Sequence, residues 1–183
     1  MSVNTRPMTA DEFLMMPDDG MFHELIRGEV TTMPLPGGRH GEIASEILRV
    51  IANHVKAHRL GKTYAAETGF LIERGPDTVR GPDVSFVRKE RLVEITNPDK
   101  HVPFAPDLAV EVVSPGDRPA EVAEKVETWL ATGARMVWVA EPRNRTVTIH
   151  VAGLENRTLT AEETLEGGEI LPGFTCKVSD FFD

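Results

Sequence analysis

Carboxylates occur beside apolar, strand-like segments at two places in this sequence. Asp83 follows a proline and precedes the apolar run 84–87, and Glu111 lies in the middle of the apolar run 108–113. A carboxylate in such a run is costly to bury unless a positive charge lies against it. If the two segments become neighbouring strands, the pair offers two oxygen ligands of the kind that Mg²⁺ or Mn²⁺ binds, with water and a substrate phosphate completing the shell. Asp83 and Glu111 are therefore the predicted metal ligands.

A third carboxylate, Asp107, lies on the same segment as Glu111. Residues four apart on a strand are on the order of 13 Å from one another, which is too far to share one cation. Asp83 and Glu111 also have structural interpretations. A Pro-Asp pair before a strand is typical of a turn or a cap, and Glu111 could form a buried ion pair that has no part in catalysis.

The elements that must position these residues are predicted from the apolar pattern. Residues 106–113 alternate between two largely apolar faces, which favours a central strand. Apolar stripes predict a long helix over 41–60 that ends at Gly61, and a second that is capped by Asp117 and ends at Gly133. The other predicted elements are a short helix ending at Pro17, two strands in 22–33 hinged near Gly28, and strands at 64–73, 84–87, 136–140 and 146–151. This order predicts an α/β (α+β) fold with a mixed central sheet flanked by helices.

The composition is typical of one globular domain, and we expect a single domain over 1–183. No membrane span or secretory signal is evident, and Cys176 is the only cysteine, so no internal disulfide can form. Both features favour a cytoplasmic protein without membrane contact. The formal net charge of −9 argues against binding nucleic acid through a broadly basic surface. It leaves room for a local basic groove or an acidic site that holds cations.

Six segments share a pattern that covers nearly the whole chain: MTADEFL, FHELIRGE, the RH pair before the long helix, GPDVSFV, PDLAVEVVSP, and EKVETWLATGARMVWVAEP with TVTIH after it. Together they resemble the Uma-type restriction endonuclease family, within the PD-(D/E)xK nuclease superfamily. The resemblance implies a restriction-endonuclease-like core of helix, three strands, helix and strand. It also implies Mg²⁺- or Mn²⁺-dependent hydrolysis of DNA. A homodimer is expected by analogy with nucleases that cut both strands.

By this resemblance, Asp83 matches the PD element and Glu111 the second acidic residue. Where the superfamily has lysine two residues later, this chain has Val113. The Uma-type family moves the lysine to the following helix, where it matches Lys125. Lys125 borders the apolar stripe of its helix, so its stem could run along the sheet toward Glu111. It also lies four residues after Glu121, the spacing of an ordinary solvated ion pair.

Glu24 matches an acidic residue that the family often carries early in the chain. It could bind the metal or hold a metal-bound water, or it could be an exposed strand residue. The predicted catalytic set is thus Asp83, Glu111, Lys125 and Glu24. In the expected reaction, the metal lowers the pKa of a bound water, and Lys125 orients that water or stabilises the charge of the transition state.

The alternative is a catalytically idle domain of the same fold that binds nucleic acid or a protein partner. The acidic composition and Val113 both favour it. His54, His58 and Cys176 are interpreted as structural, and His40 is expected near the site without an assigned role. The only candidate basic surface is a scattered group: Arg88, Lys89, Arg91, Arg143 and Arg145.

Overall fold

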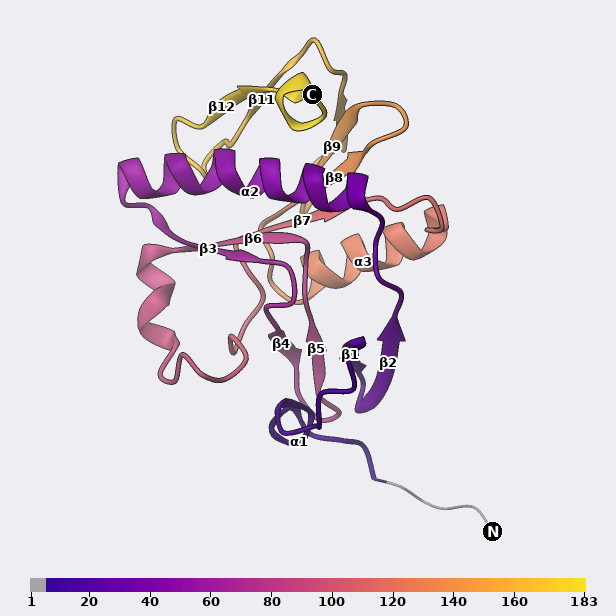
Figure 1. Cartoon of the computed structure of the whole chain (residues 1–183). Coiled ribbons are helices and arrows are strands. Elements are labelled where there is room, and N and C mark those ends of the chain that lie inside the picture. The colour runs from indigo at the N-terminus through magenta and orange to yellow at the C-terminus, as the bar shows by residue number, and fades with distance from the viewer. Residues whose placement is uncertain (1–5) are drawn as a thin grey trace.

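A six-stranded mixed sheet forms the centre of the computed structural model, which describes residues 6–183 (Figure 1). In spatial order its strands are β10 (Arg157–Leu159), β9 (Thr146–Val151), β8 (Met136–Glu141), β7 (Leu108–Val112), β6 (Val84–Arg88) and β3 (Gly61–Ala65). Strand β7 is antiparallel to β6 and parallel to β8, and all five of its residues are buried. The predicted central strand is confirmed.

Two helices cover opposite faces of this sheet. Helix α2 (Gly38–His58) lies above β6 and β7 in Figure 1, and α3 (Pro119–Ala131) lies below them. The alternation predicted for β7 decides which side chains meet each helix. Val110 packs in the α2 cluster, whereas Ala109 packs with Trp129 in the α3 cluster.

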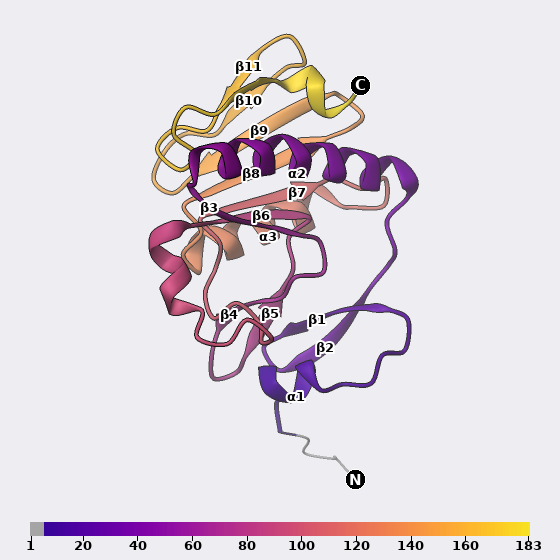
Figure 2. The same ribbon diagram turned by 60° about the vertical axis from the view of Figure 1, so that its left-hand side comes forward.

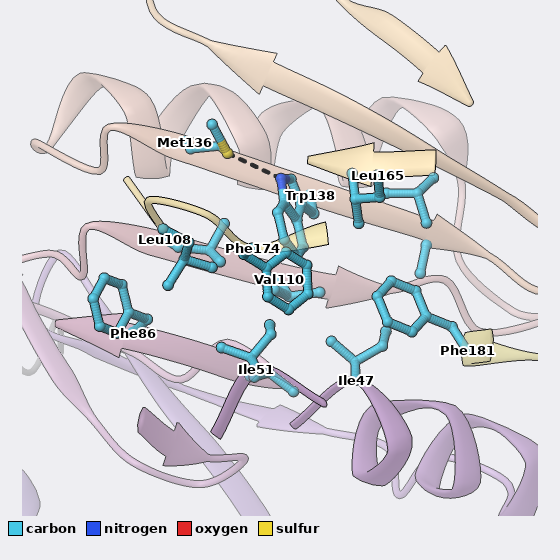
Figure 3. Close-up of a cluster of buried hydrophobic side chains, with 14 of the residues drawn as sticks. Ile47, Ile51, Phe86, Leu108, Val110, Met136, Trp138, Leu165, Phe174 and Phe181 are labelled. Carbon is cyan, nitrogen blue, oxygen red and sulfur yellow. Dashed lines mark hydrogen bonds between the residues drawn. The ribbon is translucent and has the colours of Figure 1, made fainter. Parts of the chain in front are cut away.

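The α2 face holds the larger core. In Figure 3, Ile47 and Ile51 of α2 lie near Phe86, Val110 and the aromatic side chains of the C-terminal half. The hairpin β11 (Thr164–Glu166) and β12 (Thr175–Lys177), with the 3-10 helix η2 (Val178–Phe181), completes this core on the far side of α2 (Figure 2).

A second, four-stranded sheet lies below the central sheet, on the side that α3 covers, with the short helix α1 (Ala10–Leu14) against it (Figure 2). Its strands, in spatial order, are β2 (Glu29–Met33), β1 (Phe22–Ile26), β5 (Thr78–Arg80) and β4 (Phe70–Glu73). The β1–β2 hairpin turns through Arg27 and Gly28, which have φ values of 51° and 80°. Two positive φ values in succession are typical of a tight hairpin, so the predicted hinge near Gly28 is confirmed.

Three predicted boundaries were wrong. The segment 64–73 is two strands in different sheets, β3 and β4, separated by a turn. Helix α2 begins three residues earlier than predicted, and it ends at Arg59, which adopts the left-handed conformation in place of Gly61. The N-cap of α3 is Arg118, because the Asp117 carboxylate accepts a hydrogen bond from the Ser114 backbone N–H instead.

The polar stretch after β6 contains one 3-10 helix, η1 (Lys89–Glu94). In the part of the chain that the structure describes, no helix combines the length and the apolar character that crossing a bilayer requires.

Candidate active site

Asp83 and Glu111 lie beside one another where β6 and β7 pair. Val84 is opposite Val110 in this antiparallel ladder, so Asp83 and Glu111 are the next positions along it, and Glu111 lies on the face that α3 covers. Oδ2 of Asp83 accepts a hydrogen bond of 2.7 Å from the backbone N–H of Val112. The structure thus brings the two predicted ligands together, and their binding of a metal stays a prediction.

Glu111 is buried with both carboxylate oxygens in contact with α3. The indole N–H of Trp129 donates to Oε1 over 2.8 Å, and the Lys125 ammonium lies 3.4 Å from Oε2. The pKa of Glu111 is raised to about 7, mainly by burial; the nearby carboxylates of Asp83 and Glu24 act in the same direction, and Lys125 and Trp129 oppose them. This carboxyl group therefore titrates near neutral pH unless a further cation holds it ionised.

Lys125 extends from α3 into the same place. Burial lowers the pKa of its ammonium, but the carboxylates of Glu111, Glu24 and Asp83 outweigh burial and leave that pKa above its ordinary value. The solvated pair with Glu121 is not formed, because Glu121 pairs with Arg118 at 2.7 Å. Lys125 is thus a charged group held against the predicted metal ligands.

Glu24 reaches the site from the second sheet. Its side chain is buried, so the interpretation as an exposed strand residue is wrong. Oε1 accepts a hydrogen bond from the backbone N–H of Gly81, and Oε2 lies 3.3 Å from Nε of Arg80. All four predicted site residues therefore lie in one region, although they come from β1, the start of β6, β7 and α3.

Two further side chains belong to this site: His40, which was expected near it without an assigned role, and Arg80, which the sequence alone did not identify. Nε2 of His40, in the first turn of α2, lies 3.2 Å from Oδ2 of Asp83. This hydrogen bond raises the pKa of His40 against the effect of burial. Arg80, at the end of β5, is buried beside Glu24. Two features of the sequence point to these residues: the RH pair that begins the long helix and the arginine three residues before Asp83.

These residues line a cleft with a volume of about 680 Å³. One wall is polar and carries the six side chains described above. Another is formed by the segment between β2 and α2, which includes Met33, Pro34 and Leu35. The first turns of α2 and α3 also border the cleft, through Gly37 and Glu121. In Figure 1 the segment that follows β2 rises to the start of α2.

The donor set fits a hard divalent cation. Asp83 and Glu111 supply carboxylate oxygens, which Mg²⁺ and Mn²⁺ prefer. Both contacts described for Asp83 involve Oδ2, which leaves Oδ1 for a ligand from the cleft. Within residues 6–183, no three His, Cys, Asp or Glu side chains converge as a complete metal site. Two protein carboxylates with water and phosphate suit Mg²⁺, which keeps several waters when it binds to proteins.

The arginines of the candidate basic surface make contacts within the protein. The buried carboxylate of Asp107 lies 3.0 Å from Nε of Arg88 and 3.3 Å from Nη1 of Arg91. Arg143 donates to the Pro115 carbonyl, and Arg145 pairs with Asp183. Asp107 thus stabilises the loop after β6 and lies outside the cleft, as its spacing from Glu111 predicted.

Two of the residues interpreted as structural have structural surroundings. Nε2 of His54 lies 3.0 Å from the Pro172 carbonyl oxygen, and its ring packs edge-on against Phe174 and His58. Burial raises the pKa of the Cys176 thiol to about 12, so it is unreactive as a nucleophile at neutral pH.

Comparisons with known proteins agree with this architecture. The family model Uma2, described as a putative restriction endonuclease, matches residues 10–179. The fold is also similar to a solved structure, a putative nuclease belonging to DUF820 from Anabaena variabilis ATCC 29413. The two share 25% sequence identity and a TM-score of 0.79 over 96% of this chain and 98% of that one. The chain matches no curated protein sequence. The expected fold class, with its mixed sheet and flanking helices, is confirmed.

Proposed function

Because this chain belongs to the Uma2 family of putative restriction endonucleases, we propose that it is a metal-dependent nuclease that hydrolyses the phosphodiester bonds of DNA. One observation carries the proposal: Asp83, Glu111 and Lys125 come from three separate elements and meet in one cleft. If Glu111 had only a structural role, its buried carboxyl group would not need the carboxylates of Asp83 and Glu24 nearby.

Each side chain has a part in the proposed reaction. Asp83 and Glu111 would hold Mg²⁺ or Mn²⁺, which supplies Lewis-acid activation of the phosphate and of a water nucleophile. The Val112 N–H and His40 fix the orientation of the Asp83 carboxylate. The Lys125 ammonium stabilises the negative charge that develops on the phosphate, or orients the attacking water. In-line displacement then breaks the bond to the leaving oxygen.

The proposal is tested by incubating supercoiled and linear DNA with the purified protein and Mn²⁺. The control is the double variant Asp83→Asn/Glu111→Gln from an identical preparation, which keeps side-chain shape and removes both ligand charges. We expect cleavage by the wild type alone. Equal cleavage by both would identify a contaminating nuclease and contradict the proposal.

The second candidate is an idle nuclease fold that binds nucleic acid or a protein partner. One observation favours this candidate: both carboxylate oxygens of Glu111 already contact side chains of the protein, those of Trp129 and Lys125. Thermal unfolding with and without Mn²⁺ separates the two. A nuclease is stabilised by the metal it binds, and that stabilisation disappears in the double variant. The idle domain shows no stabilisation in either protein.

A further inference from the structure

Arg80 is a buried cation with unused hydrogen-bonding groups. Its side chain is 8% exposed, and neither Nε nor Nη1 has a hydrogen-bond partner among the described residues. Nε lies 3.3 Å from Oε2 of Glu24, but that oxygen also lacks a hydrogen bond, so the N–H does not point at it. The contact is therefore an electrostatic one without hydrogen-bond geometry. A buried guanidinium in this state calls for a further partner.

The chemistry of the missing partner follows from the surroundings of Arg80. Arg80 lines the cleft, so a ligand can reach it from there. The guanidinium offers a planar set of N–H donors that matches two oxygens of a phosphate. Lys125 is close enough for Arg80 to lower the pKa of its ammonium, so two cations face one region. An oxyanion with a delocalised charge is the ligand that this pair suits.

The N-terminus of α2 provides a second, independent feature on the same cleft. The helix has 21 residues, its N-cap Gly37 makes no side-chain capping bond, and its first turn contains no acidic residue. A helix dipole favours acidic residues at this end, yet the first turn carries His40, which lines the cleft, and Arg39, which donates to the Pro142 carbonyl and does not line it. The space where a Cβ would lie at Gly37 and Gly38 is open. Exposed N–H groups with basic neighbours bind anions at a helix N-terminus.

We propose that Arg80 and the first turn of α2 form a phosphate-binding track that holds two phosphates of one polynucleotide strand on either side of Asp83. Asp83 follows Arg80 by three residues and contacts His40 of α2, and all three side chains line the cleft. Glu24 is then the positioning partner that keeps the Arg80 guanidinium in place. This inference rests on the proposed function, because the track would bind the substrate phosphates, which the carboxylates of the site cannot bind.

The test measures binding of a short fluorescent oligonucleotide in Ca²⁺ over a series of salt concentrations. Arg80→Gln removes one phosphate contact, so we expect the slope of log affinity against log salt to fall by about 0.7 to 0.9. We expect the affinity to fall roughly tenfold, as when a charged hydrogen bond is lost. Arg80→Lys keeps the charge and the slope but loses the planar donor set, so only the affinity falls.

Gly38→Glu examines the helix end without a loss of stability. An acidic residue in the first turn stabilises the helix dipole, so the thermal midpoint stays or rises while oligonucleotide binding weakens. Gly38→Gln is the neutral comparison for the added side chain, so the difference in binding between Gly38→Glu and Gly38→Gln reports the effect of the negative charge. Arg49→Gln, an exposed arginine outside the cleft, controls for general loss of positive charge.

The outcomes distinguish this track from the proposed function. A wild type that binds no oligonucleotide overturns both. A wild type that binds, with Arg80→Gln keeping the wild-type slope and affinity, overturns the track alone and leaves Arg80 as a structural partner of Glu24. Equal effects of Arg49→Gln and Arg80→Gln also overturn it, because the effect would then come from net charge.

Discussion

The Glu111 carboxyl group is buried between an indole N–H and a lysine ammonium, with two more carboxylates nearby. Its protonation state therefore depends on which cation is present. Without a divalent ion, burial favours the neutral acid, and a bound ion would favour the carboxylate. Under the proposed function, metal binding would thus be linked to the charge of one interior residue.

This link gives a prediction for the metal-free protein. The pKa of Glu111 is raised from about 4.5 to about 7, mainly by burial, so between these values the folded state binds a proton that the unfolded state has lost. The free energy of unfolding should thus fall as pH rises through this window, by on the order of 3 kcal/mol. The measurement is urea denaturation in EDTA across this range.

Glu111→Gln is the matched control, because it keeps the shape and cannot titrate. His40 also has a raised pKa, so its contribution to stability is likewise lost as pH rises, but it is present in both proteins. The difference between wild type and variant isolates Glu111. Parallel pH profiles for the two proteins would contradict the raised pKa.

Lys125 gives a second prediction at this scale. Lys125→Met keeps the aliphatic stem and removes the ammonium that contacts Glu111. We expect the rate of DNA cleavage to fall about 10²- to 10³-fold, since a group that stabilises transition-state charge is lost. Stabilisation by Mn²⁺ should persist because both proposed ligands remain. Lys100→Met, which removes an exposed lysine paired with Asp11, should cleave as the wild type does.

Among the elements, the β1–β2 hairpin delivers the site residue Glu24 from the second sheet. It pairs with β5, which carries Arg80, so the buried Glu24–Arg80 contact depends on the pairing of these strands. Two backbone bonds hold the turn: the Gly28 N–H donates to the Asp77 carbonyl, and its own carbonyl accepts from Met8. The hairpin is thus fixed at both its turn and its strands.

Gly28→Ala should disturb this element. Gly28 has a φ of 80°, and a Cβ there would lie 2.3 Å from Cβ of Pro7. We expect the free energy of unfolding to fall by more than about 1 kcal/mol, because the substitution adds a steric clash to the strain of a positive φ. Gly20→Ala is a close control, with a φ of 78° and open space at its Cβ. Equal losses in the two variants would show that the clash contributes nothing.

At the scale of the whole molecule, charge decides how DNA can bind. The net charge is −9, and arginines that seemed free in the sequence are held by Asp107 and Asp183. A surface of this kind repels polyphosphate, so attraction must come from the cleft and from the cations that it holds. Both proposals therefore place substrate contacts inside the cleft.

A homodimer remains a prediction, and it concerns the whole molecule because a nuclease with one site per chain cuts both strands most directly as a symmetric pair. Sedimentation equilibrium should then give twice the 20.2 kDa mass of one chain. A monomer throughout the micromolar range would contradict the homodimer and would favour nicking of single strands.

The sequence by itself determined the features that depend on short-range patterns. Alternation along 106–113 predicted a buried central strand that carries Glu111, and the stripe of Ile43, Ile47, Val50, Ile51 and Val55 predicted the apolar face of α2. The sequence offered Asp83 and Glu111 as a pair if their two segments became neighbouring strands, and the structure makes β6 and β7 neighbours. These predictions hold because side-chain direction repeats with a fixed period along a strand or helix.

Only the tertiary structure decided which distant residues join that pair. The burial of Glu24 against Arg80, the approach of His40 to Asp83, and the loss of Arg88 and Arg91 to Asp107 all join segments whose separation in sequence carries no periodic signal. The division of 64–73 between two sheets has the same origin. Such contacts are set by how whole elements pack against one another, and packing of the second sheet against the first is what completes the cleft.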